Sequence, residues 1–99
     1  MTREEYYQIF REAWGDEAQH NVCIEEMAEL TKELCKLKRC GISGYKRDEV
    51  EKHIKEEIAD VLNVVSQLEM MFGKDEIELI RDEKLKRTLL RLNNRWNYG

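Results

Sequence analysis

Apolar residues recur at alternating intervals of four and three through the middle of the chain. Between positions 17 and 40 this spacing joins Cys23, Met27, Leu30, Leu34 and Leu37. Between positions 49 and 72 it joins Ile54, Ile58, Val61, Val65, Leu68 and Phe72. Such spacing puts one apolar strip along each of two helices. The pattern therefore predicts two amphipathic helices that pack along these strips.

Helix starts and ends are marked throughout the sequence. A capping residue is followed three positions later by Glu or Gln four times, at Thr2 and Glu5, Asp16 and Gln19, Asp48 and Glu51, and Asp75 and Glu78. Glycines suited to a helix end stand at Gly15, Gly41 and Gly73. We therefore expect an all-α fold of four helices, near 3–14, 17–40, 49–72 and 76–96. With no linker and no low-complexity segment, residues 1–99 are expected to form one domain.

Acidic residues flank the two apolar strips in the same way. In the stretch CIEEMAEL and again in KEEIADVL, one carboxylate directly precedes a strip residue and another follows it by two positions. At 100° per residue, both carboxylates then lie on the same flank of each helix. The residues concerned are Glu26, Glu29, Glu57 and Asp60.

The heights of these carboxylates along the two helices also agree. The short loop at 41–44 is expected to turn the helix at 49–72 back antiparallel to the helix at 17–40. The sequence midpoints of Glu26 with Asp60 and of Glu29 with Glu57 are both at position 43. Two like charges ~4 Å apart repel by roughly 4 kcal/mol at an effective dielectric constant near 20. A cation is therefore expected, and oxygen ligands favour Mg²⁺, with Mn²⁺ as a possible substitute. The alternative is a solvated acidic face without a metal.

Composition excludes several classes of protein. The 99 residues carry a net charge of −4, which argues against binding a nucleic acid polymer. No apolar run approaches the roughly 18 residues of a membrane span, and the N-terminus lacks the apolar stretch of a secretory signal. Three cysteines without a CxxC motif indicate reduced thiols rather than a disulfide framework or a zinc site. We expect a cytoplasmic protein.

The sequence resembles a known family at its acidic motifs. EEMAE at 25–29 followed by EIAD at 57–60 is similar to the EExxE and ExxD motifs of the MazG-like all-α nucleoside triphosphate pyrophosphohydrolases, which are related to dimeric dUTPases. The resemblance extends from WGDEAQ at 14–19 to the basic last helix. It implies Mg²⁺-dependent cleavage of a nucleotide between the α and β phosphates. One departure is that full-length MazG proteins contain two such modules.

The resemblance also implies roles for individual residues. By position in the motifs, Glu26, Glu29, Glu57 and Asp60 would be the metal ligands, and Glu25 would support them. Glu29 is the candidate base that accepts a proton from the attacking water, although Glu26 and Glu57 remain alternatives.

Candidate substrate-binding residues lie near the acidic positions or on the last helix. Lys36 and His53 continue the acidic flank toward the loop, and Asn63 follows Asp60 by one turn. Trp14 and Gln19 precede the first acidic motif, where a ring and an amide could hold a base. A basic face suited to phosphate binding carries Lys84, Arg87, Arg91 and Arg95. For each residue, an ordinary packing or solvated role is the alternative.

The apolar surface of the third helix exceeds what one neighbouring helix can cover. Leu62, Val64 and Met71 widen its apolar arc to ~180°. We therefore expect an antiparallel helical hairpin core completed by oligomerisation, as a homodimer or homotetramer. Two other functions remain open: phosphoribosyl-ATP pyrophosphohydrolase, and a helical interaction module without catalysis.

Overall fold

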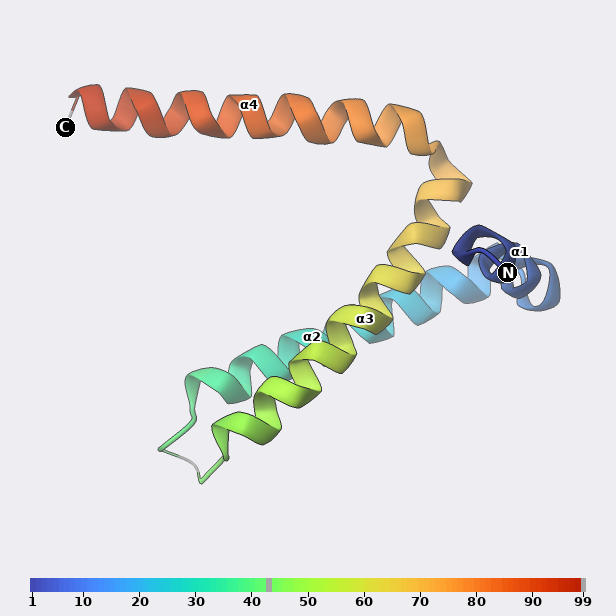
Figure 1. The fold of residues 1–99 in the computed structure, drawn as a ribbon, viewed down its shortest axis with the longest axis horizontal. Coiled ribbons are helices and arrows are strands. Elements are labelled where there is room, and N and C mark those ends of the chain that lie inside the picture. The colour runs from blue at the N-terminus through green and yellow to red at the C-terminus, as the bar shows by residue number, and fades with distance from the viewer. Residues whose placement is uncertain (43, 99) are drawn as a thin grey trace. The chain divides into compact units, whose positions relative to one another are not determined.

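The computed structural model describes residues 1–42 and 44–98, and the side chains of this range as far as Asn94. Within these residues the chain forms four helices, α1 (Arg3–Trp14), α2 (Asp16–Lys38), α3 (Arg47–Phe72) and α4 (Lys74–Tyr98), shown in Figure 1. The described residues contain no strand. The expected all-α class is therefore confirmed, and the predicted helix boundaries hold to within two residues.

The helix starts were predicted correctly in position but mostly for the wrong reason. Of the four predicted capping residues, only Thr2 is an N-cap, with its hydroxyl oxygen accepting a hydrogen bond from the Glu5 backbone N–H at 3.1 Å. Asp16, Asp48 and Asp75 instead lie inside the first turns of their helices. There they stabilise the helix through its dipole. The capping boxes predicted at these three aspartates are therefore wrong.

Gly15 alone separates α1 from α2. It caps the end of α1 and the start of α2 with φ 88° and ψ 158°, a conformation that glycine adopts without strain. The Arg11 guanidinium donates hydrogen bonds of 2.9 and 3.2 Å to the two carboxylate oxygens of Asp16 across this corner. These bonds, ahead of the charge of Arg11, lower the pKa of Asp16.

The chain divides into two compact units, Met1–Leu68 and Glu69–Gly99. In the first unit, α2 and α3 lie side by side and run in opposite directions (Figure 1). The helix α1 is joined to α3 by a 2.8 Å hydrogen bond from the Tyr7 hydroxyl to Asn63 Oδ1, and the Tyr7 side chain is buried. In the second unit, α4 exposes a strip of leucines spaced four and three apart, Leu85, Leu89 and Leu92.

The strip along which α2 and α3 bury side chains is not the most apolar one. On α2 the buried residues are Gln19, Cys23 and Glu33, with Glu26 and Leu30 half-buried between them. On α3 the buried residues are Val50, Val64 and Gln67, with Ile54, Glu57 and Val61 half-buried between the first two. In both helices the buried strip is rotated by roughly 60° from the predicted one.

This rotation exposes apolar residues that were expected in the contact. Met27 is 46% exposed, Leu34 43% and Ile58 42%. Phe72, the last residue of the predicted strip, is also exposed. The prediction was therefore wrong for these four residues. The buried strip of each helix includes glutamate, at Glu26 and Glu33 on α2 and at Glu57 on α3, so a search for the most apolar strip does not find it.

Candidate metal centre

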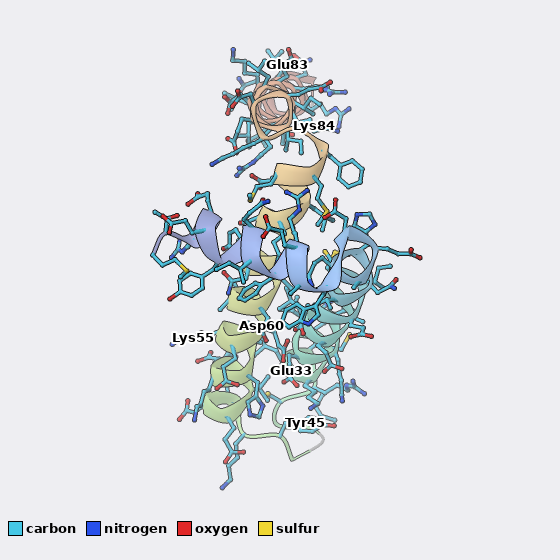
Figure 2. All side chains as sticks on the ribbon, turned by 90° about the vertical axis from the view of Figure 1, so that its right-hand side faces the viewer. Glu33, Tyr45, Lys55, Asp60, Glu83 and Lys84 are labelled. Atoms are coloured by element: carbon cyan, nitrogen blue, oxygen red, sulfur yellow. The ribbon has the colours of Figure 1, made fainter. Side chains whose placement is uncertain are left out.

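Three carboxylates meet between α2 and α3. Glu26 comes from α2, and Glu57 and Asp60 come from α3; one carboxylate oxygen of each lies within 4.8 Å of those of the other two. We call these three residues the acidic cluster. Figure 2 labels Asp60 beside the space between the two helices, whereas Lys55 lies on the outer side of α3. The three carboxylates converge because the rotated packing directs the side chains of Glu26 and Glu57 into the contact between α2 and α3.

The environment of the acidic cluster disfavours three ionised carboxylates. Glu26 and Glu57 are half-buried, and Asp60 is exposed. Burial raises the pKa of Glu26, and hydrogen bonding to Glu57 and the charge of Asp60 raise it further. The Oε2 atom of Glu57 is buried without a hydrogen-bond partner. The cluster therefore has both excess negative charge and an oxygen available to a ligand.

Glu29 lies outside the group of three close carboxylates. Its side chain is exposed, as is that of Glu25. It nevertheless lies one helical turn from Glu26, a separation at which Cβ atoms are about 5–6 Å apart. The structure thus brings together three of the four predicted metal ligands and leaves the fourth at the edge of the cluster.

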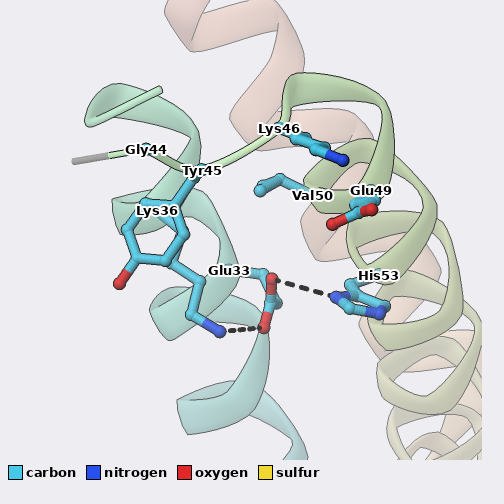
Figure 3. A pocket seen from close by; sticks show the side chains of 8 residues that line it. All are labelled: Glu33, Lys36, Gly44, Tyr45, Lys46, Glu49, Val50 and His53. Carbon is cyan, nitrogen blue, oxygen red and sulfur yellow. Dashed lines mark hydrogen bonds and ion pairs between the residues drawn. The ribbon is translucent and has the colours of Figure 1, made fainter. Parts of the chain in front are cut away.

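A second polar cluster lies nearer the loop. Glu33, 6% exposed, receives a 3.1 Å hydrogen bond from Lys36 Nζ on Oε1, and its Oε2 lies 3.8 Å from His53 Nδ1 (Figure 3). The second distance is too long for a hydrogen bond. Lys36 Nζ also lies 5.8 Å from the centroid of the Tyr45 ring. These side chains line a pocket of about 200 Å³.

The pair Glu33 and His53 also has its sequence midpoint at 43, as the acidic pairs do. The register assumed for the two acidic motifs therefore matches this contact. Lys36, a candidate phosphate ligand, is engaged by Glu33 and Tyr45 in the absence of substrate.

The candidate base-binding residues differ sharply in exposure. Gln19 is only 4% exposed, so it does not present its amide to a ligand in this structure. Trp14 is 64% exposed and stacks on Phe10 with ring centroids 5.4 Å apart. Asn63 accepts the hydrogen bond from Tyr7 through Oδ1, which leaves its amide N–H groups as its ligand-binding atoms.

The basic face proposed on the last helix lies in the second unit. Lys84, Arg87 and Arg91 are exposed on α4 (Figure 2 labels Lys84). The side chain of Arg95 lies outside the described residues. The structure therefore presents three of these cations to solvent.

A larger cavity lies between α1 and α3, and little in the sequence predicts it. Its volume is about 370 Å³, and its lining is formed by Arg3, Tyr7, Ala59, Leu62, Asn63 and Ser66. We call it the α1 cavity. The only available signal was the spacing of Arg3 and Tyr7, which puts both on one face of α1.

Comparisons with known proteins leave the family open. No family model matches the chain, and no curated protein or solved structure is significantly similar to it. Among the described residues, no helix combines the length and apolarity needed to cross a bilayer.

Proposed function

We propose that this chain is a Mg²⁺-dependent nucleotide pyrophosphohydrolase of the MazG-like type. The observation that carries the proposal is the convergence of Glu26, Glu57 and Asp60 within 4.8 Å of one another. Their positions in the sequence are those at which the family motifs place metal ligands.

The donor set suits a hard divalent cation. Octahedral Mg²⁺ binds oxygen at about 2.0–2.1 Å, so that its neighbouring ligands lie roughly 3 Å apart and its opposite ligands roughly 4 Å apart. Small side-chain rotations would bring the acidic cluster into this range. A cation would also give the buried Oε2 of Glu57 a partner and relieve the repulsion that raises the pKa of Glu26. Mn²⁺ is the expected substitute because it accepts the same oxygen ligands.

The reaction we propose consumes one water and yields a nucleoside monophosphate, pyrophosphate and a proton. The bound ion would neutralise phosphate charge and orient the triphosphate. Glu29 would accept the proton of the attacking water, because its carboxylate is exposed to solvent and lies one helical turn from Glu26. In this proposal the described carboxylates of the acidic cluster hold the metal ion, so we expect water to attack the phosphorus directly, without a covalent intermediate.

Other residues would hold the rest of the substrate. Lys36 would exchange its contact with Glu33 for a phosphate oxygen, and Asn63 would donate its amide N–H groups. Trp14 is accessible for stacking on a base. Lys84, Arg87 and Arg91 would bind phosphates within the assembled protein.

We further propose that α2 and α3 form the core of an oligomer. Apolar residues spaced along the flank opposite the acidic positions are exposed on both helices, and we call them the outer strip: Ile24, Met27, Leu34 and Ile58. Met27 and Ile58 occupy nearly matching heights on the two helices. A second copy, in a homodimer or homotetramer, would cover this surface.

The decisive test of the reaction is the identity of its products. The full chain is incubated with Mg²⁺ and a panel of canonical and modified nucleoside triphosphates plus phosphoribosyl-ATP, and the products are resolved by anion exchange. We expect a monophosphate and pyrophosphate from at least one triphosphate. Diphosphate plus orthophosphate would contradict cleavage between the α and β phosphates. Turnover of phosphoribosyl-ATP alone would assign the protein to that reaction, and no turnover with bound Mg²⁺ would indicate a non-catalytic module.

A further inference from the structure

We infer that the α1 cavity binds the nucleoside part of the substrate, through a base edge that presents carbonyl oxygens. This inference rests on the proposed function, which puts the phosphates at the acidic cluster. It assigns binding roles to Arg3, Tyr7 and Ser66, for which the sequence motifs give none.

The position of the cavity supports this assignment. Ala59, in its lining, directly precedes Asp60, and Asn63 lies one helical turn beyond. At about 1.5 Å of rise per residue, Asn63 is only ~4.5 Å along α3 from Asp60. Around α3, Asn63 lies about 60° from Asp60, so a ligand with its phosphates at the acidic cluster can reach the cavity by passing over Asn63.

The size and lining of the cavity suit a flat, partly polar group. Its volume of about 370 Å³ falls within the range of roughly 300–1,000 Å³ that is typical of small-molecule sites. Ala59, Leu62 and the ring of Tyr7 provide apolar contacts, and Arg3, Asn63 and Ser66 provide polar ones. This mixture is the one by which proteins bind and orient small ligands.

The polar groups of the lining are mainly hydrogen-bond donors. Arg3 carries five N–H donors and no acceptor. Asn63 Oδ1 already accepts the hydrogen bond from Tyr7, so its free capacity is the pair of amide N–H groups. The described residues that line the cavity include no carboxylate. The cavity therefore matches carbonyl oxygens better than amino groups, which favours uracil over cytosine at the edge that it contacts.

The test compares a nucleotide with a phosphate chain that lacks the nucleoside. Isothermal titration calorimetry measures the binding of Mg²⁺ alone, and then, with Mg²⁺ present, of uridine 5′-(α,β-methylene)triphosphate and of inorganic tripolyphosphate. The variants are Ala59→Phe, which fills the cavity, and Arg3→Ala, which removes a donor at an exposed helix start. Matched controls are Ala13→Phe, on the exposed surface of α1, and Arg47→Ala, at the first residue of α3.

We expect both test variants to weaken binding of the uridine analogue at least tenfold and to leave tripolyphosphate binding within twofold of the wild type. The two controls should bind both ligands as the wild type does. If Ala59→Phe loses helical circular dichroism or Mg²⁺ binding, Arg3→Ala decides. Unchanged affinity for the analogue with Mg²⁺ bound would overturn this inference alone. A wild-type protein that binds no Mg²⁺ would overturn the proposed function and this inference with it.

Discussion

At the scale of single residues, the two glutamates between α2 and α3 make the metal-free protein less stable than it could be. Glu26 and Glu57 occupy positions in the buried strip where apolar side chains would pack without repulsion. Because burial and its carboxylate neighbours raise the pKa of Glu26, the folded protein binds its proton more tightly than the unfolded chain does. The stability of the metal-free protein is therefore expected to depend on pH.

The sign of that dependence follows from proton binding. The folded state holds more protons than the unfolded state between the ordinary pKa of glutamate, near 4.5, and the raised value of Glu26. Over that interval the free energy of unfolding falls as pH rises, and above it the loss is complete. Glu26 thus contributes no penalty below this pH interval and its full penalty above it.

Replacing Glu26 by Gln should remove this penalty and also remove a metal ligand. In EDTA at pH 7 we expect Glu26→Gln to unfold at a higher temperature than the wild type, by roughly 4–8 °C for each 1 kcal/mol of repulsion relieved. Adding Mg²⁺ should raise the melting temperature of the wild type more than that of the variant. Thermal unfolding followed by circular dichroism at pH 4 to 8 provides the measurement. A variant less stable than the wild type in EDTA at pH 7 would show that repulsion between the carboxylates of the acidic cluster does not destabilise the metal-free protein.

At the scale of helices, local signals predicted the boundaries well because they depend on neighbouring residues only. Gly15 ends α1 and Thr2 caps it, and neither effect requires knowledge of the fold. The facing strips of α2 and α3 depend on the free energy of the whole assembly, so they were predicted less well. The most apolar strip, with Met27 and Ile58, remains exposed in the single chain, and a mixed strip with Glu26 and Glu57 is buried.

The same distinction applies to the candidate site. The relative heights of the acidic residues along α2 and α3 could be predicted from their sequence distances to the loop. Glu26, Glu57 and Asp60 converge as those distances predict. Burial of Gln19 and the α1 cavity could not be predicted, because both depend on where α1 packs against the other helices.

Gly15 offers a test of the sharp corner between α1 and α2. A Cβ atom at this position would meet no other heavy atom within 4 Å, so the cost of Gly15→Ala comes only from the backbone. With φ 88° and ψ 158°, alanine should cost roughly 1–3 kcal/mol. Denaturant unfolding should show a lower midpoint with unchanged slope. An unchanged midpoint would mean that this conformation is not maintained in solution.

At the scale of the whole molecule, many large apolar side chains are exposed in one copy. The outer strip of the first unit and the leucine strip of α4 both lack cover within the described chain. Exposed apolar surface on this scale marks an interface in most proteins. We therefore expect a second copy of the chain to cover part of this surface.

Light scattering at micromolar concentration should report at least twice the chain mass of 11.9 kDa. Ile58→Lys, which puts a charge into the outer strip, should shift the protein toward monomer. Glu56→Lys, which puts the same side chain at an exposed position of α3 outside the strip, should not. A wild-type monomer at these concentrations would contradict the proposed assembly.

The most direct test of the metal site is Mg²⁺-dependent release of pyrophosphate by the wild type and two matched variants. Glu57→Gln removes a carboxylate of the acidic cluster, and Glu56→Gln makes the same change at the adjacent, exposed position. We predict that the wild type and Glu56→Gln release pyrophosphate only when Mg²⁺ is present. Glu57→Gln should retain the helical circular dichroism of the wild type but be slower by roughly two orders of magnitude or more, a loss of about 2.7 kcal/mol or more of transition-state stabilisation. Equal rates for Glu57→Gln and the wild type, or release that persists in EDTA, would contradict the account.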